Sequence, residues 1–371
     1  MKARGIHLQY SFAAQGQRGG DVQNPLFDLL SALRLGGSIQ HAARSMGASY
    51  RHVWGQLKHW EEVLGEPLVT WAQGQPARLT PFADRLLWAE TQARARLTPH
   101  IEALRAELEH VLAEALDGGQ QVLPIHASHD LALPLLREIA RSRHRLHIDL
   151  KFTGSMDALR ALAEGRCIVA GFHVPPLAGG PHRFSRQLKP LLKPGRHKLI
   201  AAWRRQQGLI VAPGNPLQIT SLGAALAPGL RFVSRQRGSG TRLLTEHLLA
   251  EQGLDATHAA MLERTVEESH VAVAAAVASG RADAGVGVAQ AAVEYQLGFV
   301  PLVDEDYFLV CLDDSLEHPA VQALRHCLAG AAWAAEVSCL AGYTAPANAG
   351  QVLSLTRALP WWHFRSPKAR G

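Results

Sequence analysis

The chain has 371 residues, of which 47% are hydrophobic, 19% charged and 6% aromatic. This composition is typical of globular proteins, and the length suits two or three domains. No apolar run reaches the roughly 18–20 residues that a membrane helix needs, so a membrane-spanning protein is excluded. The N-terminal stretch is basic but lacks the apolar core of a signal peptide, so we expect a cytoplasmic protein with no membrane partner.

The charge is unevenly distributed along the chain. Residues 1–60 carry a net charge of +5 and residues 61–118 one of −5, within a total of +6. A basic head followed by an acidic segment is typical of a nucleic-acid-binding module on a solvated helical connector. Uneven surface charge alone would give the same pattern, so both interpretations stay open here.

Residues 24–64 show the hydrophobic spacing of short helices separated by glycines. Ser38 and Ser49 stand where they would cap a second and a third helix. The small residues Ala42 and Ala43 would let two helices cross closely, as a helix-turn-helix requires. The residues expected to face inward are Leu26, Leu29, Leu30, Leu33, Ile39, Ala42, Ala43, Met46, Val53, Leu57, Trp60 and Leu64.

Two short strand-like pieces follow at residues 67–71 and 77–80, joined by a hairpin tip that contains Gly74 and Pro76. Helices followed by a hairpin predict a winged helix-turn-helix DNA-binding domain over residues 24–80, with the third helix in the major groove. Arg51 would contact a guanine edge or a phosphate, and Gln56 an adenine edge. The alternative is a small helical domain that docks on another protein. The predicted DNA-binding residues are Ser38, Ser49, Tyr50, Arg51, His52, Trp54, Gln56, Lys58 and Arg78.

A long helix is predicted over residues 81–117, because Thr80 suits the cap and Pro81 the first helical position. Apolar residues then recur in alternating four- and three-residue steps, which is a heptad seam along which two copies would pair. We expect a homodimer or tetramer through this linker helix, which suits a two-fold operator. The alternative is one amphipathic helix lying on its own core. The seam residues are Leu97, Ile101, Leu104, Leu108, Val111 and Ala115.

These residues resemble a known family of regulators. The run SIQHAARSMGASYRHVW at 38–54 is similar to the helix-turn-helix of ModE-type molybdate regulators, most diagnostically in Ser49-Tyr50-Arg51 followed by Trp54. GEPLV at 65–69 and LTPFA at 79–83 resemble the wing and linker-helix start shared by ModE-type and LysR-type regulators. The resemblance covers about residues 24–115 and implies binding to double-stranded operator DNA.

Residues 121–362 alternate strands with helices, which predicts an α/β domain with a mostly parallel sheet. Ligands in such folds bind beyond the carboxyl ends of strands, where helix N-termini present free N–H groups. Hydroxyl residues recur at these points, and nearby arginines would add charge for an anion, although any single serine there would also serve as a helix cap. The predicted ligand-binding residues are His126, Ser128, Ser155, Arg235, Gly238, Ser239, Gly240, Thr241, Arg242, Ser269 and Tyr307.

The same segment resembles the type 2 periplasmic-binding-protein fold, specifically its molybdate-binding-like branch. The residues that carry the resemblance are RQRGSGTR at 235–242, GRADAGVG at 280–287, LAGY at 340–343 and LPWW at 359–362. It implies two lobes, at about 121–203 with 308–362 and at about 209–304, with chain crossings near 203–209 and 304–308. Tyr307 would reach the ligand there or pack at the hinge. It also implies an oxyanion ligand: molybdate, tungstate or a molybdenum-cofactor-related molecule.

Catalytic and metal chemistry find little support in the spacing of the reactive residues. Cys167, Cys311, Cys327 and Cys339 are far apart without C-x-x-C, and the histidines show no zinc spacing. No G-x-S-x-G elbow is present. We therefore predict no catalytic residues, no metal and no cofactor. His126 and His129, on either side of Ser128, are interpreted as pocket walls or donors to an anion, or else as solvated loop residues.

The predicted architecture is an α/β protein with an all-α winged-helix N-terminal domain and a bilobed C-terminal sensor. We expect a transcription regulator that senses an oxyanion and controls molybdenum-related genes. One alternative is a LysR-like regulator that senses a small carboxylate or a phosphorylated metabolite. Another is an enzyme acting on a phosphorylated or pterin substrate. A solute-binding protein without a DNA role would lack the winged helix.

Overall fold

The computed structural model describes residues 24–70, 77–116, 121–177, 182–254, 258, 260–359 and 361–362. The chain divides into two compact units, Met1–Glu90 and Thr91–Gly371, and the boundary between them falls within the predicted linker helix. Within the described ranges, no helix is both long and apolar enough to cross a membrane.

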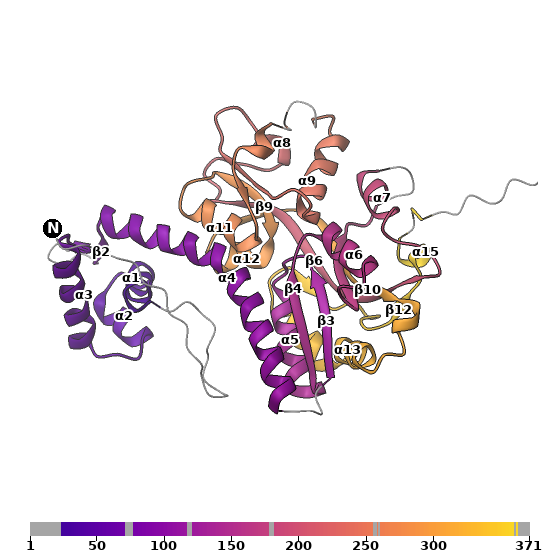
Figure 1. The fold of residues 1–371 in the computed structure, drawn as a ribbon. Coiled ribbons are helices and arrows are strands. Elements are labelled where there is room, and N and C mark those ends of the chain that lie inside the picture. The colour runs from indigo at the N-terminus through magenta and orange to yellow at the C-terminus, as the bar shows by residue number, and fades with distance from the viewer. Residues whose placement is uncertain are drawn as a thin grey trace, which may run out of the picture. The chain divides into compact units, whose positions relative to one another are not determined.

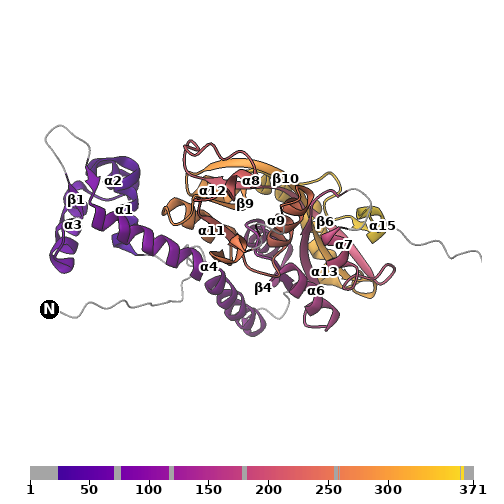
Figure 2. The same ribbon diagram turned by 90° about the horizontal axis from the view of Figure 1, so that it is seen from above.

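The first unit contains helices α1 (Pro25–Gly36), α2 (Ile39–Ser45) and α3 (Tyr50–Leu64), gathered around one core in Figure 2. Ser38 and Ser49 cap α2 and α3 as predicted, accepting the N–H groups of His41 and His52 at 3.1 and 3.2 Å. The expected inward positions are buried or half-buried, except Met46, which is 39% exposed. Met46 is exposed because it is the C-cap of α2 and not part of its buried stripe.

The wing follows as an antiparallel pair of short strands, β1 (Val69–Thr70) and β2 (Arg78–Leu79). Both lie inside the predicted strand segments, and the predicted tip lies outside the described residues. Helix α4 (Pro81–Leu116) then begins where the sequence predicts, because the Thr80 hydroxyl accepts the N–H of Ala83 at 3.1 Å.

The exposure of the side chains on α4 can be compared with the predicted pairing seam. Leu104 is 49% exposed, whereas Leu97, Ile101 and Leu108 are half-buried. The side chains of Val111 and Ala115 lie outside the description. Ala95, which belongs to the second unit, packs against Ala272 and Ala275 of the same unit. Pairing between two copies of α4 therefore stays a prediction.

Besides residues 91–116 of α4, the second unit consists of strands that alternate with helices. Its strands are β3 (Gln121–Ala127), β4 (Leu146–Phe152), β5 (Val169–Val174), β6 (His197–Val211), β7 (Phe232–Arg235), β8 (Val266–Glu267), β9 (Ala284–Val288), β10 (Gly298–Leu312), β11 (Tyr343–Thr344) and β12 (Val352–Leu353). Its helices are α5 (Ala132–His144), α6 (Ser155–Ala163), α7 (Arg183–Leu188), α8 (Leu222–Ala225), α9 (Gly240–Glu251), α11 (His270–Ala278), α12 (Ala289–Glu294), α13 (Pro319–Ala329), α14 (Ala331–Val337) and α15 (Leu355–Ala358).

The long strands β6 and β10 form the centre of the sheet, whose order is β4-β3-β5-β10-β6-β9-β7-β8. They pair with each other antiparallel over their whole lengths. Residues 306–311 of β10 pair with β5, while residues 207–211 of β6 pair with β9. Each long strand therefore passes from one lobe into the other. The predicted crossings at 203–209 and 304–308 lie within these strands, near the point where the partners change.

The prediction of a mostly parallel sheet is correct for the flanks and wrong for the centre. The β3–β4, β3–β5, β7–β8 and β7–β9 pairs are parallel, but β10 and β6 run antiparallel to their neighbours. The sequence also suggests two strands, at 199–203 and 209–211, where the structure has one. The polar run between them reads as a loop, yet it continues the strand because its buried side chains find long-range partners.

Each lobe packs its helices on its own part of the sheet. Helices α5, α6 and α13 contact β3, β4 and β5, whereas α8, α9, α11 and α12 lie around β7 and β9 (Figure 1). Leu222 and Phe232 belong to a core within the second lobe, whereas another core joins the lobes, since it contains Ile125 of β3 as well as Val273 of α11. This arrangement confirms the predicted bilobed fold.

Candidate anion site and nucleic-acid interface

A buried charge network lies where the long strands cross between the lobes. Arg205 on β6 is fully buried and donates to Glu305 on β10 through Nε at 3.2 Å and Nη2 at 3.1 Å, and to Asp130 through Nη1. Glu305 also accepts a hydrogen bond from Gln207 at 2.7 Å and lies 2.8 Å from His173 Nδ1. Burial alone would raise the pKa of Glu305, but His173 and Arg205 hold it at about 2. These groups therefore form a buried network in which one guanidinium is shared by two carboxylates.

A second set of buried polar groups beside this network lacks internal partners. In the described part of the chain, no hydrogen-bond partner is found for Ser128 Oγ, Ser155 Oγ, His129 Nδ1, His270 Nδ1 or Arg235 Nε. We call these five residues the anion cluster. Ser128 and His129 follow β3, Ser155 and His270 begin α6 and α11, and Arg235 is the last residue of β7. Buried polar atoms are nearly always hydrogen-bonded, so this cluster is suited to a polar ligand or ordered water.

Arg235 gives the anion cluster its charge. Its side chain is buried, and its guanidinium donates to the backbone carbonyl of Glu268 at 2.7 Å. Burial and the neighbouring Arg205 lower its pKa to about 9, which still leaves it charged at neutral pH. No carboxylate within the described residues lies at ion-pair distance from it. A buried cation with only a carbonyl partner favours an anionic ligand.

The histidines of the anion cluster are neutral donors or acceptors. Burial, followed by repulsion from Arg235 and Arg205, lowers the pKa of His129 to about 3 and that of His270 well below its usual value. Both lie close enough to Arg235 to be affected by its charge, and the two serine hydroxyls add further buried groups able to donate hydrogen bonds. This donor-rich set can bind oxygen atoms of an anion.

These neutral histidines predict acid sensitivity. The folded-state pKa of His270 is depressed, so its neutral form stabilises the fold fully above about pH 6.5, and this stabilisation is lost as the pH falls and the unfolded chain takes up a proton. We expect His270→Gln to reduce the pH dependence of the unfolding free energy as the pH falls below about 6.5, by at most about 1.4 kcal/mol per pH unit. Urea unfolding at several pH values would measure this. The exposed His326→Gln should leave the slope unchanged, and an equal effect of both variants would contradict the assignment.

The two lobes touch at glycines around the anion cluster. A Cβ atom on Gly240 would lie 2.4 Å from His173 Nε2 and 3.0 Å from Ser155 Oγ, and one on Gly154 would lie 2.7 Å from the carbonyl oxygen of Gly238. Gly238 itself has a φ of +83°, which favours glycine. The lobes are therefore in a closed arrangement that only these small residues allow.

The predicted ligand residues divide into groups with different surroundings. Ser128, Ser155 and Arg235 lie in the anion cluster, with Gly238 and Gly240 at the lobe contact. Thr241 accepts a hydrogen bond from Gln207 at 2.9 Å, and Tyr307 donates to the carbonyl of Ser128 at 3.3 Å while stacking on Trp203. Ser239 and Ser269 cap α9 and α11.

Two predicted ligand residues have other roles. Arg242 donates to Glu246 at 2.7 Å, to Glu263 at 2.5 Å and to the Leu262 carbonyl at 2.8 Å, so its guanidinium anchors α9. His126 lies on β3, where burial, followed by the charges of Lys151 and Arg166, lowers its pKa. Of the two histidines beside Ser128, it is His129, beyond the end of the strand, that belongs to the anion cluster.

Sequence reasoning missed the network of Arg205, Gln207 and Glu305. A weak signal is present, since Arg205 and Gln207 alternate with other residues and an acidic run at 304–306 stands about a hundred residues later. Only the pairing of β6 with β10, which sets Arg205 opposite Glu305, shows that these charges contact each other.

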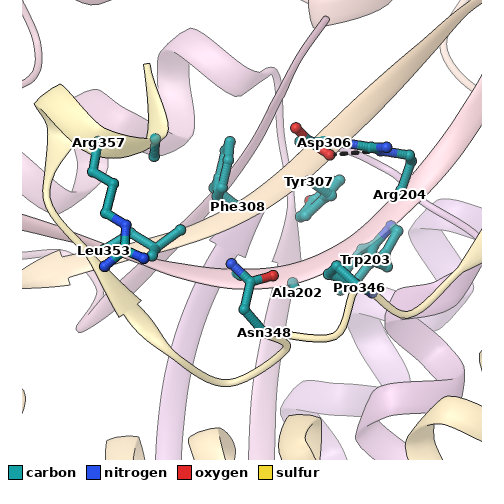
Figure 3. A pocket seen from close by; sticks show the side chains of 12 residues that line it. Ala202, Trp203, Arg204, Asp306, Tyr307, Phe308, Pro346, Asn348, Leu353 and Arg357 are labelled. Carbon is teal, nitrogen blue, oxygen red and sulfur yellow. Dashed lines mark hydrogen bonds and ion pairs between the residues drawn. The ribbon is translucent and has the colours of Figure 1, made fainter. Parts of the chain in front are cut away.

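A separate pocket of about 220 Å³ lies at the same crossing, lined partly by the C-terminal segment. Figure 3 shows Asn348 and Arg357 beside Phe308 and Leu353, with the Arg204–Asp306 ion pair nearby. Its lining residues do not include the anion cluster.

The predicted DNA-binding residues lie at the start of α3 and on the wing. Tyr50 is 55% exposed, and Arg51, His52 and Arg78 are exposed as well. Trp54 and Gln56 are half-buried, and Lys58 contacts Glu61 at 2.7 Å and lies over the Trp54 ring. Ser38 and Ser49 act as helix caps. The early turns of α3 thus present basic and aromatic groups, as a recognition helix does.

Together these features define a two-part protein in which a winged helix-turn-helix precedes a bilobed binding domain. Residues 136–329 match the family described as the PBP superfamily domain, and since this match spans more than half of the chain, the chain belongs to that superfamily. Residues 26–84 match the bacterial regulatory helix-turn-helix protein of the lysR family.

Two curated relatives share part of this sequence. The uncharacterized protein YvgK of Bacillus subtilis is 30% identical over 193 residues, which are 52% of this chain and 61% of that protein. The molybdenum-pterin-binding protein MopB of Rhodobacter capsulatus is 31% identical over 120 residues, which are 31% of this chain and 42% of that protein. The chain thus spans less than two thirds of either relative.

Solved structures with both parts are more distant. Full-length BenM is 16% identical, with a TM-score of 0.40 and coverage of 87% of this chain and 99% of that one. Full-length CbnR in complex with its target DNA is also 16% identical, with a TM-score of 0.40 and coverage of 82% and 97%.

Proposed function

We propose that the protein is a ligand-responsive, LysR-type transcription regulator that binds operator DNA through residues 24–80 and an oxyanion through the anion cluster. The observation that carries the second part is Arg235, a buried guanidinium without a carboxylate partner among the described residues. The matched helix-turn-helix family supports the first part. Such a regulator would act in the cytoplasm, and the exposed Leu104 supports self-association through α4.

The chemistry of the anion cluster favours an oxyanion. Hydroxyl groups, neutral imidazoles and one guanidinium supply several donors around a single positive charge, which suits a compact anion with several oxygens. Molybdate or tungstate fits this description, and the name of MopB supports a molybdenum-related ligand. The regulated genes would then be molybdenum-related. A phosphorylated metabolite or a small carboxylate is the competing ligand class.

Thermal unfolding of the full chain with molybdate, tungstate, sulfate, phosphate and formate tests the ligand. Binding to the folded state alone adds about 2.7 kcal/mol at a ligand concentration of 100 times Kd. A higher Tm with molybdate and tungstate but not sulfate would support a metal-oxyanion sensor. A shift with phosphate or formate alone would favour the competing class, and no shift with any anion would overturn the proposed oxyanion site.

DNA binding makes its own prediction. We expect Arg51→Gln to weaken binding to duplex DNA and to reduce the slope of log affinity against log salt by about one unit, because one cationic contact with the phosphate-rich groove is lost. Fluorescence anisotropy of a labelled duplex over a salt series measures both quantities. The control is Glu62→Gln, an exposed position about three turns along the same helix, which should not weaken binding. An unchanged slope for Arg51→Gln would contradict the predicted recognition surface.

A further inference from the structure

Residues 92–96 of the linker helix α4, which belong to the second unit, pack along α11. Arg96 donates to both carboxylate oxygens of Glu267, at 3.0 and 2.5 Å. At the other end of α11, just beyond its last residue Ala278, Arg281 donates to Gln92 at 2.6 Å, and Gln92 donates to Ser279 at 3.2 Å. Between these contacts, Ala95 packs against apolar residues of α11.

Arg96 contacts the segment 267–270, which contributes His270 and the carbonyl partner of Arg235 to the anion cluster. Glu267 is only 3% exposed and lies on β8 opposite Arg235 of β7. The next residue, Glu268, provides the carbonyl that accepts from Arg235, and the residue after the Ser269 cap is His270. Arg281 and Gln92, by contrast, meet at the C-terminal end of α11, away from the cluster.

We infer that Arg96 is a positioning residue of the anion cluster: through Glu267 it fixes the Glu268 carbonyl, and thereby the guanidinium of Arg235. This inference rests on the proposed function and adds that the anion affinity depends on the docking of α4. The bidentate form of the contact matters, because two parallel bonds to one carboxylate fix both position and orientation. By thermodynamic reciprocity, an anion bound at Arg235 strengthens the docking of α4.

The nearby contact between His100 and Glu268 cannot replace Arg96. Their closest atoms are 3.7 Å apart, and both side chains are more than half exposed. Exposed pairs of this kind contribute little. The buried Glu267 carboxylate is therefore the point at which the helix holds this segment.

The test compares Arg96→Gln with Arg281→Gln in the full chain. Each variant removes one polar contact between α4 and the α11 region, at opposite ends of α11. We expect Arg96→Gln to weaken molybdate binding about tenfold by calorimetry, within the range of typical coupling between sites, and Arg281→Gln to leave it unchanged. Arg96→Lys keeps the positive charge but cannot make the bidentate contact, so its molybdate affinity should lie between those of Arg96→Gln and the wild type.

Hydrogen exchange supplies readouts that general destabilisation would not give. Without ligand, Arg96→Gln should accelerate exchange at residues 266–272 more than Arg281→Gln does. With molybdate, wild-type protein should gain protection at residues 91–101, and Arg96→Gln should not. Wild-type affinity together with unchanged exchange in Arg96→Gln would overturn the inference. If wild-type protein binds no anion, the proposed ligand site fails, while the ligand-free exchange still decides whether Arg96 positions this segment.

Discussion

Replacement of Arg205 by methionine is expected to lower the free energy of unfolding of the second unit by about 3–5 kcal/mol, because it leaves Asp130 and Glu305 as buried, unneutralised carboxylates. The Arg205 side chain is fully enclosed and contacts both acids. Methionine fills a similar volume but supplies no charge, so most of the loss comes from the missing neutralisation. Urea unfolding at pH 7, followed by tryptophan fluorescence, measures the effect.

The neighbouring residue provides the matched control for this change. Arg204 follows the same strand and pairs with Asp306 at 2.9 Å, but its side chain is 51% exposed. Exposed ion pairs contribute about 0–1 kcal/mol, so Arg204→Met should fall within that range. Equal losses for the two variants would show that the charge of Arg205 is not what stabilises the lobe crossing.

Replacement of Arg235 by methionine is expected to have opposite effects on ligand affinity and on ligand-free stability. Loss of a buried charged partner costs about 2–5 kcal/mol of binding, so molybdate affinity should fall by about 30-fold or more. Without ligand, stability should stay unchanged or rise, because the guanidinium is desolvated and held by one carbonyl. Calorimetric titration and thermal unfolding of the same preparation measure the two effects.

Arg237 provides the control on the same loop. Its side chain is 80% exposed and pairs with Glu263 at 3.1 Å, outside the anion cluster. Arg237→Met should keep the molybdate affinity within about twofold, since surface charges act weakly at a distance in salt. Retained affinity in Arg235→Met would remove the basis for the anion site. A fall in ligand-free stability would show that Arg235 has a structural role.

Local sequence signals were sufficient for much of the fold. Caps such as Ser38, Ser49 and Thr80 mark helix starts because their hydroxyls satisfy backbone N–H groups within three residues. The strand–helix alternation of residues 121–362 likewise predicted the bilobed domain. In both cases the determining interactions lie close together in the chain or repeat with a simple period.

The centre of the site could not be predicted in the same way. Arg205 and Glu305 are a hundred residues apart, and their contact depends on the register of β6 against β10. The same lack of long-range information made the polar stretch before Gly208 resemble a loop. It also left His126 and His129 equivalent, although one lies on β3 and the other beyond its end.

The glycine contacts between the lobes have a consequence for the timing of the response. Closed lobes place the anion cluster where an ion enters or leaves only after the hinge opens. Exchange of the proposed ligand is then limited by the opening rate rather than by diffusion. Motions of this type take microseconds to seconds. The protein would therefore average over brief fluctuations in anion concentration. Its ligand occupancy would follow only changes that last longer than the time between hinge openings.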